Sequence, residues 1–169
     1  MPHSRHFALA DPVIAHLNSV VCNVTDQFIL SRYVGLIAVA AVTVYELCIK
    51  DIFWRFSSRK HKVFGTFVSK HFEKINGRIR LCDIKGEYLP RFGEVYLKGF
   101  AARLDEAENL ELRGSGRSII ASYNNIITWR HQFAHEGIFV STVTYSEAVD
   151  CYALGKGVIR VLAETMTDE

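Results

Sequence analysis

The sequence contains few of the residues that interrupt helices or build disulfide frameworks. Proline occurs only at positions 2, 12 and 90, so long segments can be helical without interruption. The cysteines are widely separated and form no C-x-x-C pair: Cys22, Cys48, Cys82 and Cys151. Two of them, Cys48 and Cys151, fall within apolar helical patterns, where a reduced cysteine behaves as a small hydrophobic residue. We expect all four to be structural thiols of a protein in a reducing compartment.

Long apolar runs and targeting segments are also missing. The N-terminal residues Met1 to His6 are not followed at once by the apolar stretch of a secretory signal. The most apolar run, Tyr33 to Tyr45, spans 13 residues, whereas a helix that crosses a bilayer needs about 20. These observations predict a cytoplasmic protein without a membrane partner, and a helix that is buried on nearly all sides.

Charge is nearly balanced over the chain but unevenly distributed along it. The 169 residues have a net charge of +2 and are 49% hydrophobic, which excludes disorder as a description of the whole chain and predicts one globular domain over residues 1–169. Between Lys50 and Arg80, however, nine basic residues stand against two acidic ones. A basic band in a near-neutral protein favours a polyanionic partner, although a solvated helix face explains the charge equally well.

Hydrophobic spacing predicts an all-α bundle of about five main helices around one dominant core. We expect helices over residues 12–30, 33–56, 63–74, 118–136 and 144–166, and a helical stretch that begins at 95 and fades by 109. Asp11 is the expected N-cap before Pro12, and Thr144-x-x-Glu147 has the pattern of a capping box. The expected connections are residues 57–62 and 113–118, residues 78–92 are either irregular or a short helix, and strand signals are confined to residues 138–143.

The segment Thr128 to Gly137 concentrates polar chemistry at the end of an apolar helix. It places Arg130, His131 and His135 within six residues. Cationic groups are costly to bury without partners, so we expect these side chains to line a cleft. An ideal helix would turn Arg130 and His135 about 140° away from each other. A compact site therefore requires that the helix loosens before Gly137, or that a twofold partner supplies a second copy.

These residue types suit the cleavage of RNA. Histidine titrates near neutral pH and can take a proton from a ribose 2′-OH or give one to the leaving oxygen. Arginine remains charged and offers a planar fork to a phosphate whose negative charge grows in the transition state. A histidine and an arginine from each of two subunits would supply acid, base and charge stabilisation without a metal.

The segment Arg130-His-Gln-Phe-Ala-His135 resembles the R-x4-6-H motif of HEPN domains, and the polar residue after the arginine, His131, fits that pattern. The context agrees, because a long helix that ends in the motif is followed by a short link and a capped last helix. The chain is most similar to HEPN proteins grouped with the RiboL-PSP type and related bacterial defence systems. The resemblance is strongest from about Ser118 to Leu162.

The resemblance implies a helical bundle, a homodimer whose two motifs face each other, and a metal-independent endoribonuclease that needs no cofactor. It implies products with a 2′,3′-cyclic phosphate and a 5′-hydroxyl. Proteins of this family are often toxins or abortive-infection effectors that a partner, such as an antitoxin, holds inactive. In some HEPN toxins a tyrosine two residues after the histidine is nucleotidylated; Gly137 stands there in this chain, which argues against that form of regulation.

The resemblance also assigns roles to individual residues. It implies that Arg130 and His135 are catalytic and that His131 supports them. Glu46, the first charged residue after the apolar run, resembles an acidic residue on an earlier helix of some HEPN proteins and is a candidate to orient Arg130. The basic band adds three candidates for binding RNA phosphates: Arg59, Lys60 and Lys62.

Other interpretations of these residues stay open. His135 can be a helix-end histidine that the C-terminal dipole favours, and Arg130 can form a structural ion pair with Glu46 or Glu136. His131 and His135 have the spacing of two zinc ligands on a helix, although Gln132 stands where the glutamate of H-E-x-x-H would be. The two glycines between Arg113 and Ser118 do not follow the phosphate-loop pattern. Finally, the chain can be a non-catalytic HEPN module that serves only association.

Overall fold

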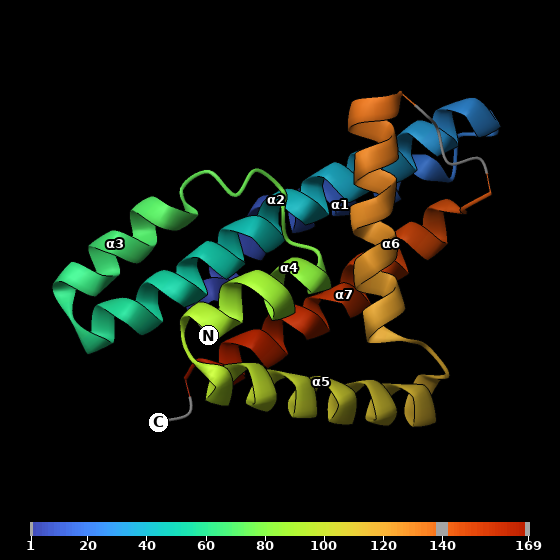
Figure 1. Cartoon of the computed structure of the whole chain (residues 1–169). Helices are drawn as coiled ribbons and strands as arrows, with labels where there is room; N and C mark the ends of the chain where they lie inside the picture. Colours follow the sequence, from blue (N-terminus) through green and yellow to red (C-terminus); the bar gives the residue numbers. More distant parts are fainter. Residues whose placement is uncertain (1, 138–141, 168–169) are drawn as a thin grey trace.

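The computed structural model describes residues 2–137 and 142–167, and these form a bundle of helices (Figure 1). Within this described part there is no strand, as the all-α prediction requires. The α-helices, in chain order, are α1 (Asp11–Val21), α2 (Gln27–Lys60), α3 (Lys62–Phe72), α4 (Leu81–Asp83), α5 (Glu94–Ser115), α6 (Ile119–His131) and α7 (Tyr145–Thr165). Shorter 3-10 or π segments complete the chain: η1 (Pro2–Leu9), η2 (Ile84–Tyr88), η3 (Leu89–Arg91) and η4 (Gln132–Glu136).

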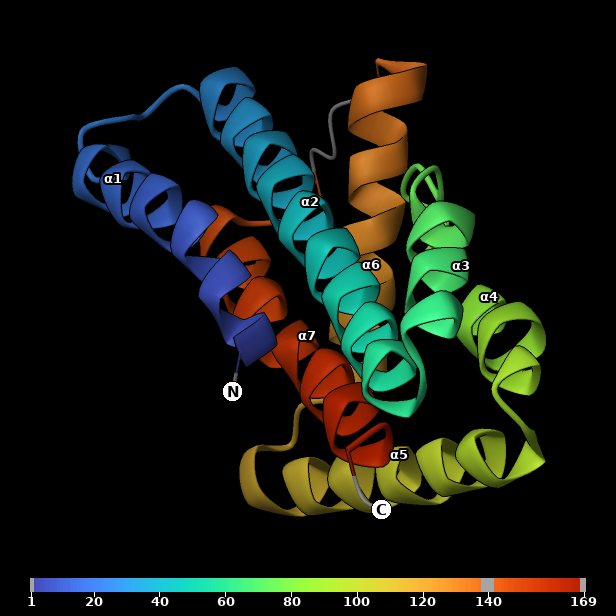
Figure 2. The same cartoon turned by 90° about the vertical axis from the view of Figure 1, so that its left-hand side faces the viewer.

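Helix α2 is the central element of the bundle. It packs against η1, α3, α6 and α7, and Figure 2 shows it between α1 and α7 on one side and α3 and α6 on the other. Tyr45, in the middle of α2, is fully buried and stacks on Tyr123 of α6 and Tyr152 of α7. Its hydroxyl donates a hydrogen bond of 2.6 Å to the carbonyl oxygen of Tyr152. These contacts join the three helices on which the candidate site depends.

The length of α2 differs from the prediction and bears on the membrane question. At 34 residues, α2 is long and apolar enough to cross a membrane by length and composition alone. Half of its most apolar window is nevertheless buried inside the bundle, as expected for a core helix. The helix thus gives only weak evidence for a membrane span, in agreement with the expectation from the 13-residue apolar run.

The first helix begins where it was predicted to within one residue, but the boundary between the first two helices differs from the prediction. We expected one helix to reach Leu30, but α1 ends at Val21 and α2 begins after Asp26, whose carboxylate accepts a hydrogen bond from the backbone N–H of Phe28. The expected N-cap, Asp11, lies inside α1. Its carboxylate instead accepts hydrogen bonds from the Tyr152 hydroxyl (2.5 Å) and from the Lys156 amine (2.8 Å) and thereby ties α1 to α7.

The connection between α2 and α3 is shorter than the predicted break over residues 57–62. Helix α2 continues to Lys60, and His61 alone adopts an extended conformation (φ −163°, ψ 140°). Its Nδ1 accepts a hydrogen bond from the N–H of Val63 and so caps α3. A side chain on Gly65 would lie 2.2 Å from the Ser58 hydroxyl, so glycine at this position lets α3 fold back closely along α2.

Helix α5 is longer than predicted. Its second half is mostly polar, so apolar spacing does not reveal that the helix continues. Apolar spacing fades by Asn109, but residues with high helix propensity continue the helix to Ser115. Gly116, with φ +72°, ends it in the left-handed conformation. The predicted connection over residues 113–118 is therefore wrong for its first half, which is the last turn of α5. The ambiguous residues 78–92 contain the short segments α4, η2 and η3.

The last two helices agree with the prediction. Helix α6 continues into η4, which ends at Glu136 directly before Gly137, and α7 begins after Thr144, whose hydroxyl accepts a hydrogen bond from the N–H of Glu147. Most of the segment with strand signals, residues 138–141, lies outside the described residues.

Candidate active site

The end of α6 widens into the π-helical segment η4. A π-helix pairs each N–H with the carbonyl five residues earlier, and the N–H of Gly137 accordingly donates to the carbonyl oxygen of Gln132. Gly137 has φ +65°, a left-handed conformation that glycine adopts without steric cost. The wider turn places side chains that are five residues apart next to each other. The helix thus loosens before Gly137, as a compact site within one chain requires.

Arg130 and His135 are in direct contact across this turn. Arg130 Nη1 lies 2.7 Å from His135 Nε2. Arginine can only donate, so a hydrogen bond across this contact requires Nε2 of His135 to be the acceptor. Arg130 is half-buried whereas His135 is exposed. A phosphate from solvent can therefore approach both side chains.

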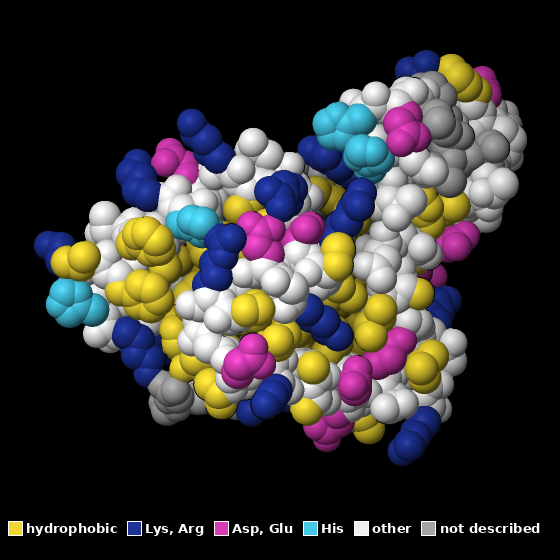
Figure 3. All heavy atoms as spheres, viewed as in Figure 1, with side chains coloured by type: hydrophobic (Ala, Val, Ile, Leu, Met, Phe, Trp, Pro, Cys, Tyr) yellow, Lys and Arg dark blue, Asp and Glu magenta, His cyan; other side chains and the backbone are white. Residues whose placement is uncertain are grey.

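His131 lies beside this pair. The ring centroids of His131 and His135 are 5.2 Å apart, and His131 Nε2 lies 3.4 Å from a carboxylate oxygen of Glu136. Figure 3 shows the two histidines together at the free end of α6, with an acidic side chain next to them. In the part of the chain that the structure describes, no group of three or more His, Cys, Asp or Glu side chains is arranged to hold a metal ion. The donor set that the zinc alternative requires is therefore not found there.

The widened turn is fixed in place by Phe133. Its ring lies over Gly35 of α2, where a side chain on Gly35 would come within 2.1 Å of the ring. Glycine at position 35 thus allows α2 and η4 to approach closely enough for the aromatic ring to fill the gap. Because Phe133 lies between Arg130 and His135 in the sequence, this contact also positions these two candidate site residues.

Glu46 reaches Arg130 only through a backbone loop. One carboxylate oxygen of Glu46 accepts a hydrogen bond from Lys50 (2.6 Å), and the other accepts one from the N–H of Gly77 (2.6 Å). Gly77 has φ +77°, and the Arg130 guanidinium lies against it, about 3.5 Å from where a side chain would begin. Among the described residues Arg130 forms no ion pair with Glu46 or Glu136, so the structural ion-pair alternative is not observed.

The three residues expected to bind RNA phosphates lie far from the motif. Arg59, Lys60 and Lys62 belong to the turn between α2 and α3, at the opposite end of α2 from Gly35. At 1.5 Å per residue, Gly35 and Lys60 are about 37 Å apart along the helix. Arg59 donates to the carbonyl oxygen of Met166 (3.3 Å) at that end. Within one chain, these residues and the motif do not form one site.

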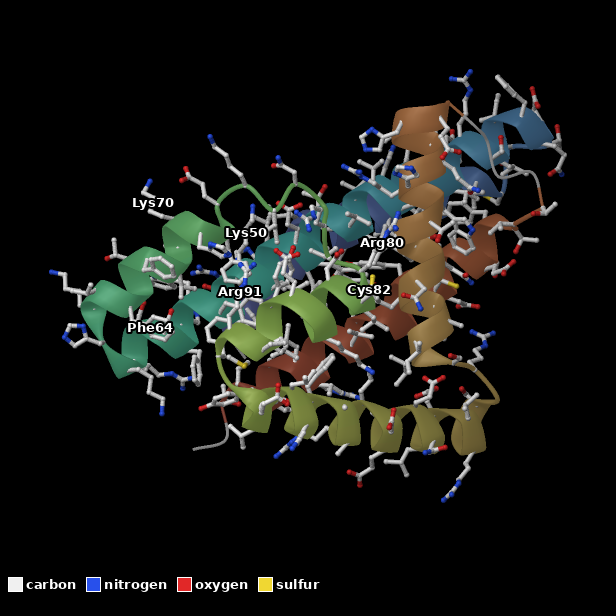
Figure 4. All side chains as sticks on the ribbon, in the orientation of Figure 1. Lys50, Phe64, Lys70, Arg80, Cys82 and Arg91 are labelled. Atoms are coloured by element: carbon white, nitrogen blue, oxygen red, sulfur yellow. The ribbon has the colours of Figure 1, made fainter. Side chains whose placement is uncertain are left out.

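Other basic residues of the same band lie nearer to the motif. The loop that contains Gly77 also carries Arg78 and Arg80, both exposed. Figure 4 shows Arg80 close to α6. Arg78 and Arg80 belong to the basic band that the sequence shows between Lys50 and Arg80. The sequence does not distinguish them from Arg59, because only the fold shows which part of the band lies near α6.

Two of the four cysteines are buried and two are exposed to solvent. Cys48 and Cys151 are buried, and burial raises the pKa of the Cys48 thiol to about 12 and also raises that of Cys151. Both therefore behave as inert hydrophobic side chains, as expected. Cys22 and Cys82 are free and exposed, so the expectation of a packing role is not met for them.

A protein-family model described as RiboL-PSP-HEPN matches residues 11–168 of the chain. The chain belongs to this HEPN family. The match covers α1 to α7, so it extends the resemblance well beyond the stretch from Ser118 to Leu162 in which the sequence shows it most clearly. No curated protein and no solved structure matches the chain. Membership of the HEPN family is consistent with a ribonuclease or a nucleotide-related function.

Proposed function

We propose that this HEPN protein is a metal-independent endoribonuclease whose reaction depends on Arg130 and His135. The observation that supports it most strongly is their 2.7 Å contact across an exposed π-turn at the end of α6. A residue that can exchange a proton near neutral pH and a residue that can bind a phosphate thereby meet at one accessible point. A structural ion pair would need a carboxylate, which this contact lacks.

In the proposed reaction the Arg130–His135 contact is the resting state. A phosphate of the RNA competes for the guanidinium, because a charge-assisted bidentate contact is stronger than a bond to a neutral imidazole. His135 Nε2 is then free to take the proton of the ribose 2′-OH. The 2′-oxygen attacks the phosphorus and the bond to the 5′-oxygen breaks. The products are a 2′,3′-cyclic phosphate and a 5′-hydroxyl, as the family resemblance implies.

The leaving oxygen also needs a proton, and one imidazole cannot act as base and acid in a single step. A second copy of the chain with its motif opposite would supply a second His135, whose protonated imidazole would give its proton to the 5′-oxygen while the first His135 takes the proton of the 2′-OH. His131 is the other candidate, because its ring is adjacent to that of His135 within the same chain. We therefore propose a homodimer with a composite site in which His131 positions or assists.

The biological role that fits this activity is that of a toxin or an antiviral, abortive-infection effector in the cytoplasm, restrained by an antitoxin or a partner in a defence complex. The proposal rests on the family alone. A second function of a different class is a non-catalytic HEPN module for dimerisation or association. The exposed position of His135 favours the nuclease, because a scaffold gains nothing from an arginine and a histidine held together at the surface.

The experiment that separates the two functions is cleavage of total RNA in EDTA by the wild type and by Arg130→Ala and Arg130→Lys. We expect cleavage by the wild type and by neither Arg130 variant, because lysine keeps the charge but not the planar fork. Arg117→Ala is the matched control, since Arg117 pairs with Asp150 (2.7 Å) at the other end of α6. Equal cleavage by all four proteins would reject the site, and a dimeric wild type without activity would favour the association module.

A further inference from the structure

Helix α3 carries an aromatic surface that the core does not use. Val63 and Phe67 are 69% and 65% exposed, the largest exposures of apolar side chains on α3, and His71 follows four residues later. Residues 63, 67 and 71 are four apart and so form one stripe along the helix. The rings of Phe67 and His71 are nearly parallel, with an interplanar angle of 13° and centroids 6.0 Å apart. The outer face of Phe67 is open to solvent.

A stripe of lysines runs beside the aromatic stripe. Lys62 and Lys70 lie on α3 at positions 62 and 70, and Lys74 continues the four-residue spacing just beyond the helix. All three are exposed, and Glu73 is the one acidic residue in this segment, paired with Lys70 at 3.3 Å. In the described chain Lys62 and Lys74 have no ion pair. The surface therefore combines flat rings with positive charge. Among the described residues the charge of Lys62 and Lys74 is unpaired, whereas Lys70 exchanges Glu73 for a phosphate when an anion binds.

His71, the ring on which Phe67 lies, is held by the core beneath it. His71 packs edge-on against the buried ring of Phe72, at a centroid distance of 5.0 Å, and is contacted by the Arg91 guanidinium. Arg91 in turn binds Glu87 (3.0 Å), which also binds Arg78 (2.8 Å). A ring fixed in this way binds a flat ligand at a lower entropic cost than a mobile one.

This surface and the motif lie on one face of the molecule. Figure 3 shows hydrophobic side chains over α3, bordered by basic and histidine side chains, on the same side as the histidine pair of α6. Figure 4 shows Lys70 on α3, Arg91 beside it and Arg80 near α6. His71 and Gly77 are joined by a short loop that cannot span more than about 22 Å, and the Arg130 guanidinium lies against Gly77. The distance is one that a short single strand can bridge.

We propose that α3 is a binding site for single-stranded RNA, in which a base stacks on Phe67 next to His71 while Lys70 and Lys74 contact phosphates. This inference rests on the proposed ribonuclease function, because it supplies that reaction with its substrate. Aromatic rings interleaved with cations are the surface that single strands require, since every base has a face that can stack. The strand then runs over the loop with Arg78 and Arg80 towards Arg130. A purely apolar protein partner would not use the lysine stripe.

The test measures binding separately from cleavage. His135→Ala protein, which we expect not to cleave RNA, serves as the parent, and each further substitution is introduced into it. Each protein is titrated into fluorescein-labelled single-stranded RNA of about 12 nucleotides, and the affinity is measured. We expect Phe67→Ala and Phe67→Leu each to weaken binding roughly 5- to 150-fold, the range measured for loss of base stacking. Val95→Ala removes an equally exposed side chain on α5 and should leave the affinity unchanged. Lys70→Ala with Lys74→Ala should reduce the salt slope by about 1.4.

The stacking itself is read from a 2-aminopurine base in the RNA, whose fluorescence should be quenched by the parent protein but not by Phe67→Leu. Full affinity and quenching in both Phe67 variants would overturn the inference, even if the wild type cleaves RNA. Binding in Phe67→Leu that equals the parent, with loss only in Phe67→Ala, would also overturn it and indicate an apolar docking surface for protein. Stacking by a protein that never cleaves RNA would reject the nuclease and retain the binding site.

Discussion

The ring of Phe133 occupies the space in which a side chain on Gly35 would lie. The closest approach would be 2.1 Å. Real Cβ atoms do not come so close to a ring. The position of the Phe133 ring therefore requires glycine at position 35. Since Phe133 lies in η4, between Arg130 and His135, the packing of α2 against this turn fixes the geometry of the candidate active site.

Gly35→Ala should therefore impair both the fold and the site. Overpacking of this kind costs about 1–3 kcal/mol, and the displaced ring should pull η4 away from α2. We expect a lower midpoint in urea unfolding and weaker RNA cleavage under folded conditions. Gly99→Ala in α5 is the matched control, because its new methyl group would lie 3.6 Å from Thr165, an ordinary contact, and should not destabilise the protein.

The double variant Gly35→Ala with Phe133→Ala isolates the contact. Removing the ring makes room for the new methyl group, so the two effects on the free energy of unfolding should be clearly less than additive. Strict additivity would mean that Gly35 and Phe133 do not share one space, and would contradict the packing described here.

Glu46 should act on Arg130 through Gly77. Glu46→Ala removes a hydrogen bond to a charged group, which is typically worth about 1.5–3 kcal/mol. We expect the amide hydrogen of Gly77 to exchange faster with solvent and RNA cleavage to fall. Lys50→Met removes the Glu46–Lys50 pair and the hydrogen bond from Lys50 to the Glu73 carbonyl oxygen (2.9 Å), but it keeps the Glu46–Gly77 bond. The amide of Gly77 should therefore exchange more slowly in Lys50→Met than in Glu46→Ala. Equal exchange rates in wild type and Glu46→Ala would show that Glu46 does not hold this loop.

The sequence predicts the motif but not the turn that brings Arg130 and His135 into contact. The apolar spacing of α6 and Gly137 locate the end of the helix, and the R-x4-H pattern identifies the two residues. A π-turn cannot be recognised from the apolar spacing of α6. It adds one residue to a single helical turn, so it changes the direction of a few side chains and leaves the pattern of the helix before it unchanged. The contact with Gly35 is equally invisible, since it joins residues 98 positions apart and depends on how α2 and α6 cross.

The basic band between Lys50 and Arg80 was found from the sequence, but the positions of its residues in space were not. Nine basic residues that are close in the sequence are spread over two helices and a loop, because α2 spans the whole molecule. Arg59 and Arg78 thus belong to one sequence feature and lie in different places. Charge counting finds the band, and only the antiparallel packing of α3 on α2 shows which part of it returns to α6.

Stability should decrease in mild acid because of His3. His3 is 7% exposed, and its carbonyl oxygen accepts a hydrogen bond from the Cys48 thiol, which anchors η1 on α2. Burial lowers the pKa of His3 below its ordinary value of 6.5. The unfolded chain then binds a proton at a pH at which the folded chain does not, so the free energy of unfolding falls as the pH drops below about 6.5.

Urea unfolding of wild type and His3→Gln at pH 7.5, 6.5 and about 5.5 tests this effect. The glutamine variant has no imidazole to protonate, so its stability should depend less steeply on pH in this range. Parallel pH profiles for the two proteins would show that His3 does not contribute.

The proposed cleavage of RNA by Arg130 and His135 is tested best by the chemical ends of the RNA products. RNA is incubated in EDTA with wild-type and with His135→Ala protein, and the termini of the fragments are identified by mass spectrometry. We predict 2′,3′-cyclic phosphate and 5′-hydroxyl ends from the wild type and intact RNA from His135→Ala. Fragments with 5′-phosphate ends, or the same fragments from both proteins, would contradict the claim.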